Sequence, residues 1–201
     1  SSLPGVVYGT AGGSLASDAA WVQKNAARIG AGGERLTASI LERLAARPGG
    51  VTVMHDLDIP LPGFAANIDH VVVAGRQVTL IDSKVWRSGI YRTHAGVTTR
   101  SGKPAEFADK RTLKAGIDGY RRHLRIHNLE DVTLRAVLIA WSSHPLLPAV
   151  VSAYTPVGAA AVSGWRFRLS PAAWVGKGAA DPTLVAALLP LVRTENKNGH
   201  A

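Results

Sequence analysis

The stretch Asn67–Trp86 constrains the fold of this chain more than any other part of the sequence. It contains two runs of apolar and β-branched residues, Ile68–Val73 and Val78–Val85, with Gly75 and Arg76 between them. Glycine at the first central position suits a two-residue type II′ turn, and β-branched runs on both sides are typical of strands. The stretch therefore predicts a β-hairpin.

The turn also predicts which residues of the hairpin face each other. With Gly75 and Arg76 as the central pair, opposed residues have numbers that sum to 151. Opposed side chains point to the same side of a sheet, and side chains repeat every second residue. One face of the hairpin is therefore expected to carry Asn67, Asp69, Val71, Val73, Val78, Leu80, Asp82 and Lys84.

This register sets Asp69 opposite Asp82, and like charges in directly opposed positions destabilise a sheet. A divalent cation between the two carboxylates would remove the conflict, because Mg²⁺ takes oxygen ligands and keeps several waters. Lys84, one pleat beyond Asp82, would then hold a phosphate or activate a water. The alternative is that both aspartates are ordinary surface residues at strand ends, or that a bulge changes the register.

Composition indicates one folded domain. The 201 residues are 46% hydrophobic and only 18% charged, which suits a buried core and excludes a disordered chain. We expect a flexible segment at residues 1–16, which are rich in Gly, Ser and Ala, a single domain at 17–193 and a polar tail at 194–201.

The charge balance indicates an anionic partner. Lys and Arg exceed Asp and Glu by 23 to 14, a net charge of +9, which favours nucleic acid first and an anionic membrane second. The absence of cysteine excludes disulfides and thiolate metal sites. With no apolar run of membrane-spanning length and no signal-peptide pattern, a cytoplasmic location is expected.

The order of predicted elements indicates an α/β fold with a central mixed β-sheet flanked by helices on both faces. The predicted helices are 18–29 and 34–47, separated by a break at the glycines of 30–33, then 105–127 and 183–192. The predicted strands are 51–57, the hairpin 67–86, a second hairpin 89–100, and 132–141, 150–154 and 165–169.

The helix predicted at 105–127 is the most basic element of the chain, and such a helix suits contacts to phosphates. A solvated helix face is the competing interpretation. The cations expected to bind nucleic acid are Lys110, Arg111, Lys114, Arg121 and Arg122.

Two further motifs suggest other chemistry. His123 and His127 have the i, i+4 spacing of zinc ligands, but no third ligand is evident nearby. Ser143 and His144 suggest a hydrolase, although adjacency in sequence is not triad geometry and no G-x-S-x-G motif is present.

A combination of motifs between Gly30 and Ile90 resembles the nuclease-related domain (NERD) family. The motifs are Gly30-x-x-Gly33-Glu34 opening a helix, Val53-x-His55-Asp56, Ile68-Asp69-His70-Val71-Val72-Val73, Asp82-Ser83-Lys84-x-Trp86 and Gly89-Ile90. That family is similar to the restriction-endonuclease-like superfamily with its P-D…(D/E)-x-K signature. The resemblance implies a restriction-endonuclease-like core.

The resemblance also implies roles for individual residues. Asp69 and Asp82 would hold the metal, with Glu34 as a direct or outer ligand and the carbonyl of Ser83 completing the shell, and Lys84 would be the catalytic lysine. This sequence departs from the pattern in three ways. Asp82 stands where Glu is commoner, no proline precedes Asp69, and the later helix lacks the family's Gln, for which Lys110 or Lys114 stands in.

These observations together predict a Mg²⁺-dependent DNA endonuclease or nickase of low sequence specificity, with Mn²⁺ as a substitute metal and RNA as an alternative substrate. A second hypothesis is a catalytically inactive nucleic-acid-binding module with the same fold, and a third is a domain that associates with anionic membranes. The oligomeric state is left open, with a homodimer as one option.

Overall fold

The computed structural model describes residues 2–12 and 21–194, with the backbone alone described for residues 21–31. Its larger sheet has the strand order β1-β2-β3-β4-β8-β10, and a smaller sheet has the order β7-β6-β5-β9. The strands are β1 (Val7–Tyr8), β2 (Thr52–Asp58), β3 (Asn67–Ala74), β4 (Gln77–Trp86), β5 (Gly89–His94), β6 (Val97–Arg100), β7 (Lys103–Pro104), β8 (Thr133–Ser142), β9 (Ala149–Ala153) and β10 (Ala160–Ser163). The helices are α1 (Trp21–Ala45), α2 (Thr112–Ile126), α3 (Gly164–Leu169), α4 (Pro171–Val175) and α5 (Pro182–Leu188), with 3-10 turns η2 (Glu106–Asp109) and η3 (Leu189–Leu191).

The larger sheet is mixed and central, as predicted. Strands β2, β3 and β4 are antiparallel neighbours, whereas β4 and β8 run parallel over ten pairs from Gln77↔Thr133 to Trp86↔Ser142. The apolar run of β8 matches this position, because a strand between two others with both faces covered is nearly all hydrophobic. The predicted α/β architecture is confirmed.

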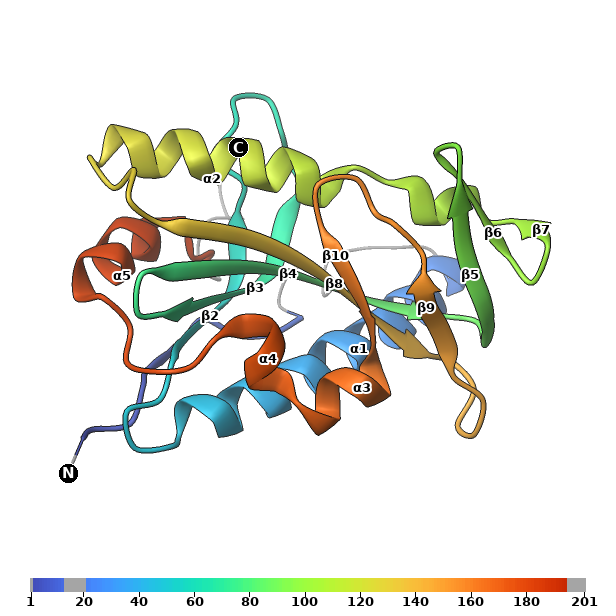
Figure 1. Ribbon diagram of the computed structural model, residues 1–201, viewed down its shortest axis with the longest axis horizontal. Helices are drawn as coiled ribbons and strands as arrows, with labels where there is room; N and C mark the ends of the chain where they lie inside the picture. The colour runs from blue at the N-terminus through green and yellow to red at the C-terminus, as the bar shows by residue number, and fades with distance from the viewer. Residues whose placement is uncertain (1, 13–20, 195–201) are drawn as a thin grey trace.

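Helices cover both faces of this sheet, with α2 on one side and α1, α3 and α4 on the other (Figure 1). On the α2 side, Leu113, Ile117 and Tyr120 pack into the same core cluster as Val71 and Leu80. The hairpin face predicted from the register therefore lies under α2. The opposite face of the hairpin packs against α1.

The predicted helix break at residues 30–33 is wrong, since α1 is continuous from Trp21 to Ala45. A glycine in a helix costs only about 1 kcal/mol, which packing against a sheet readily outweighs. Gly33 has a packing reason for its missing side chain, because a Cβ there would lie 2.7 Å from Cγ2 of Val85. The glycine brings α1 close to β4.

Two other predicted elements differ from the structure. The segment Trp165–Leu169, predicted as a strand, belongs to helix α3, and the neighbouring strand is β10. The basic helix begins at Thr112 instead of Ala105, because the turn η2 precedes it. The second hairpin is confirmed at β5 and β6, but it belongs to the smaller sheet.

β1 and Arg193, near the two ends of the described residues, both bond to neighbouring parts of the fold. Within residues 1–16, the strand β1 pairs with β2 in parallel. The backbone N–H of Arg193, the last residue of the predicted domain, donates to the carbonyl of Asp56 at 2.9 Å, and its Nε donates to Asp58 at 2.5 Å. Across residues 2–12 and 21–194, no helix has the length and apolar character needed to cross a membrane.

Candidate active site

The candidate site lies where the ladder between β3 and β4 ends. The ladder runs from Ala74↔Gln77 to His70↔Ile81, so the predicted register, with numbers summing to 151, is confirmed over these pairs. Beyond His70 the strand β3 stays paired with β2 alone, as far as Asp58↔Asn67. The predicted pairing of Asn67 with Lys84 is therefore not formed, and an opening separates β3 from this end of β4.

The side chain of Asp69 fills part of that opening. Its carboxylate accepts a 2.7 Å hydrogen bond from the backbone N–H of Ser83, which has no β3 backbone partner there. The N–H and C=O of one strand residue point to the same side of the strand, so the carbonyl of Ser83 faces the same opening. The hydroxyl of Ser83 lies on the other face and donates to Thr37 of α1 at 2.8 Å.

The structure brings the carboxyl groups of Asp69 and Asp82 together, although the β3–β4 ladder ends one pair before these residues, at His70↔Ile81. Both residues are only 7% exposed. Burial, the charge of Asp82 and a hydrogen bond between the two carboxyl groups raise the pKa of Asp69 well above its ordinary value. A pair of buried carboxyls in contact is unfavourable when both are ionised, and a bound proton or cation relieves it.

Lys84 supplies the positive charge next to this pair. Its Nζ donates a 2.5 Å hydrogen bond to Oδ1 of Asp82. Burial works to lower the pKa of Lys84, but the carboxylates of Asp82 and Asp69 outweigh it and raise the pKa above its usual range. Lys84 is therefore a permanent cation at neutral pH.

Glu34 reaches the same group from helix α1. Burial raises its pKa to about 7, with Lys84 lowering it and Asp82 raising it. The helix is held in place by Thr37, whose hydroxyl accepts hydrogen bonds from Ser83 at 2.8 Å and from Nε1 of Trp141 at 2.9 Å. All four predicted catalytic side chains thus interact electrostatically.

The oxygen donors fit a hard divalent cation such as Mg²⁺. Asp69, Asp82, the carbonyl of Ser83 and Glu34 are all oxygen donors, and the contact between two buried carboxyls is the feature that a cation would relieve. Over the part of the chain that the structure describes, no three His, Asp or Glu side chains form a ready-made metal cluster. Water would therefore complete the shell.

A small cavity opens beside Asp82 and Lys84. Its volume is about 60 Å³, which corresponds to roughly two water molecules. The residues that line it are Asp82, Lys84, Trp86, Phe107, Ala108, Lys110, Thr112, Leu113, Leu138, Pro156 and Val157. The space is of the size of a single phosphate group, and a nucleobase is too large for it.

The predicted nucleic-acid-binding residues divide into two groups. Lys110 lines the cavity, and Arg111 follows it at the start of α2. Lys114 forms a 2.7 Å ion pair with Asp118 on the helix surface. Arg121 and Arg122 are exposed but lie roughly 15 Å further along α2, at 1.5 Å per residue. The structure does not bring this second group to the site.

Sequence reasoning missed two residues beside the centre. Asp56 lies level with Asp69 across β2 and β3, accepts a 2.7 Å hydrogen bond from Asn67, and contributes to the raised pKa of Glu34. Its place in the motif Val53-x-His55-Asp56 was the sequence signal that could have identified it. Phe107 lines the cavity although it is half-exposed, and it was hidden inside a helix predicted too long.

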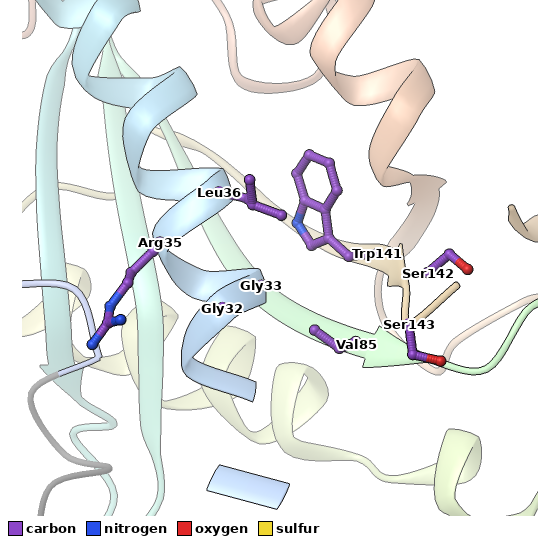
Figure 2. A pocket seen from close by; sticks show the side chains of 8 residues that line it. All are labelled: Gly32, Gly33, Arg35, Leu36, Val85, Trp141, Ser142 and Ser143. Atoms are coloured by element: carbon purple, nitrogen blue, oxygen red, sulfur yellow. The ribbon is translucent and has the colours of Figure 1, made fainter. Parts of the chain in front are cut away.

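A larger pocket of about 550 Å³ lies on the α1 side of β4 and β8 (Figure 2). Figure 2 shows Trp141 extending from β8 toward Leu36, with Val85 near Gly33. Ser142 and Ser143 lie at its edge. Nδ1 of the neighbouring His144 accepts the backbone N–H groups of residues 146 and 147, at 3.1 and 3.0 Å. This bonding is that of a loop turn and gives the hydrolase hypothesis no support.

The predicted zinc pair also has a structural explanation. The rings of His123 and His127 lie 4.6 Å apart, and Nε2 of His123 is 2.8 Å from the carbonyl of Ala187 on α5. This contact ties α2 to α5.

Comparisons with known proteins gave one match. A family model described as "Nuclease-related domain" (NERD) matches residues 29–133, which is more than half of the chain. The matched range includes the candidate site from Glu34 to Lys110. The searches of curated proteins and of solved structures found no match.

Proposed function

The chain belongs to the nuclease-related domain family, and from that premise we propose that it is a metal-dependent nuclease that hydrolyses phosphodiester bonds in DNA. One observation carries the proposal. Asp69 and Asp82 are buried against each other at the opening between β3 and β4, with Lys84 hydrogen-bonded to Asp82. A cluster of this kind is costly to a fold and useful to phosphoryl chemistry.

The proposed metal is Mg²⁺, with Mn²⁺ as a substitute. Asp69, Asp82 and the carbonyl of Ser83 would hold it, with Glu34 as a direct or outer ligand. When bound, such an ion polarises the scissile phosphate and lowers the pKa of an attacking water. The buried walls of the site strengthen these charge interactions, because the local dielectric is low.

Lys84 acts in this proposal as a charge stabiliser. Its raised pKa keeps it protonated at neutral pH, so it is a poor general base. A protonated amine next to the cavity can donate to the phosphate oxygens on which charge accumulates in the transition state. Its bond to Asp82 holds the amine in place before the substrate binds.

The basic residues next to the cavity would bind the phosphate backbone. Lys110 is best placed because it lines the cavity, and Arg111 and Lys114 follow it at the start of α2. Arg121 and Arg122 would contact more distant phosphates. Backbone contacts carry no sequence information, so we expect cleavage of low sequence specificity.

The test is nicking of supercoiled plasmid in Mg²⁺, Mn²⁺ or EDTA by the wild type, Asp82→Ala and Lys84→Ala. The wild type should nick only with a metal present, and each variant should lose about 10²-fold or more in rate. Asp131→Ala is the matched control, because this aspartate side chain is fully exposed and remote from the site. Undiminished nicking by Asp82→Ala would disprove the site assignment.

A second readout does not depend on cleavage. Calorimetric titration with Mn²⁺ should show binding to the wild type and to Asp131→Ala, and weaker or absent binding to Asp82→Ala. Binding that is equal in all three proteins would contradict the proposed ligands.

The second candidate function is a nucleic-acid-binding module that does not cleave. The observation in its favour is the 2.5 Å bond from Lys84 to Asp82, which offsets part of the carboxylate charge without a metal ion. This candidate predicts salt-sensitive DNA binding that is unchanged by EDTA and by Asp82→Ala, with no nicking in any metal.

A further inference from the structure

Phe107 is an aromatic residue held at the mouth of the catalytic cavity. It belongs to the turn η2, lines the same cavity as Asp82 and Lys84, and is 49% exposed. A half-exposed aromatic ring beside a phosphate-sized cavity can contact the sugar or base of the nucleotide whose phosphate enters the cavity.

The position of Phe107 is fixed by other aromatic rings. Its ring centroid lies 5.6 Å from that of Trp86 and 6.2 Å from that of Tyr91, at angles of 75° and 78°. The hydroxyl of Tyr154 donates to the carbonyl of Ala108 at 2.6 Å, which anchors the turn. Edge-to-face contacts hold the ring without covering all of its surface.

Trp86 joins this aromatic cluster to the catalytic strand. It ends β4 two residues after Lys84. The centroid of its ring lies 4.7 Å from that of Tyr91 in a tilted contact and 5.3 Å from that of Tyr154 in an edge-to-face contact. Packed rings therefore fix the position of Phe107 relative to the strand that carries Lys84.

The lining of the cavity combines charged and apolar side chains. Asp82, Lys84 and Lys110 are its charged residues, and Phe107 and Val157 are among its apolar ones. A nucleotide has the same two characters, with a charged phosphate and an apolar base face. The volume of about 60 Å³ admits the phosphate, so the base would lie outside, at the exposed ring.

We propose that Phe107 stacks on an unpaired nucleobase next to the scissile phosphate, and that the substrate is single-stranded or locally unpaired nucleic acid. This inference rests on the proposed nuclease function. In a duplex both faces of a base are covered by its neighbours, so a base must leave the stack to reach a protein ring. Stacking on an aromatic ring accepts any base, which agrees with low sequence specificity.

A double-mutant cycle in EDTA tests the stacking without cleavage. It measures the affinity of wild type and Phe107→Ala for a single-stranded oligodeoxynucleotide, and for versions with one abasic site placed at each position in turn. Phe107→Ala should weaken binding of the intact strand by about 5- to 100-fold. One abasic position should weaken the wild type similarly and leave Phe107→Ala unchanged.

Two variants act as controls. Phe107→Trp keeps an aromatic face and should restore most of the affinity. Trp165→Ala removes a similarly exposed aromatic residue, 52% exposed on α3, and should leave the affinity within about twofold of the wild type. For a duplex of the same sequence, Phe107→Ala should change the affinity by less than about twofold.

Three results would overturn the inference. The first is that Phe107→Ala loses as much affinity for every abasic strand as for the intact strand. The second is that it loses as much affinity for duplex as for the single strand. The third is that Phe107→Trp fails to restore binding. A parallel nicking assay in Mg²⁺ separates the two proposals. If the wild type nicks DNA but Phe107→Ala and the abasic site act independently on affinity, only the stacking proposal is rejected. If the two changes are coupled but the wild type does not nick DNA, only the nuclease proposal is rejected.

Discussion

Replacing Glu34 with glutamine should stabilise the metal-free protein at pH 8 and have little effect at pH 5. The folded state raises the pKa of Glu34 from an ordinary 4.5 to about 7, chiefly through burial. Between these values the folded chain binds more protons than the unfolded chain, so this residue's contribution to stability decreases as the pH rises. Glutamine mimics the protonated form and removes that loss.

The magnitude follows from the two pKa values. At about 1.4 kcal/mol per pH unit, a change from 4.5 to about 7 is worth about 3 to 4 kcal/mol before solvent screening. Because Glu34 is only half-buried, solvent screening reduces this to about 1–2 kcal/mol. The expected gain for Glu34→Gln is therefore about 1–2 kcal/mol at pH 8, falling toward zero at pH 5.

The assay is urea unfolding of wild type and Glu34→Gln in EDTA at both pH values. Glu130→Gln is the matched control, since this carboxylate is 70% exposed at the far end of α2. Addition of Mg²⁺ at pH 8 should stabilise the wild type more than Glu34→Gln, because the ion offsets the clustered negative charge. A gain that is equal at pH 5 and pH 8, or a loss at pH 8, would refute the reasoning.

Two further predictions concern the glycines of α1 and the buried histidines. Gly32→Ala should stabilise the protein by about 0.5–1 kcal/mol, since no atom lies within 4 Å of the added Cβ. Gly33→Ala should cost about 1–3 kcal/mol, because the added Cβ would press against Val85. Thermal unfolding of both variants checks this, and equal effects would contradict it. His70 contacts His55 at 2.8 Å between Nδ1 atoms, and burial lowers the pKa of both rings below 6.5. The unfolded chain therefore takes up more protons at these two residues below about pH 6.5, so they remove stability as the pH falls, at up to about 1.4 kcal/mol per pH unit for each proton. Glu34 and Asp69, whose pKa values are raised, add stability as the pH falls over part of this range, so the wild type must be compared with a variant. Between pH 7.5 and 5.5, His70→Phe should lose less stability than the wild type. An equal loss would show that the histidines do not cause the pH dependence.

The hairpin shows how far local sequence rules reach. Two residues, Gly75 and Arg76, were enough to predict the register that the structure forms from Ala74↔Gln77 to His70↔Ile81. The rule failed beyond His70, where the ladder with β4 ends while β3 stays paired with β2 as far as Asn67. Where a ladder ends depends on contacts with the rest of the fold, which a hairpin's own sequence does not contain.

The errors in α1 and α3 have a similar origin. Glycines at 30–33 are unfavourable in an isolated helix, yet α1 continues because Gly33 allows close packing on β4. The segment Trp165–Leu169 reads as a strand from its residue types but forms a helix beside Trp141. In both cases packing against the sheet outweighs propensities of about 1 kcal/mol.

The sequence by itself determined the class of fold, the facing of Asp69 and Asp82, and the presence of Lys84 on the same strand face. These features follow from side-chain alternation and turn geometry, which act over a few residues. Only the tertiary structure decided that β3 opens away from β4, that Glu34 approaches from α1, and that Phe107 lies at the cavity. These depend on contacts between segments distant in the chain, whose free energies no local pattern encodes.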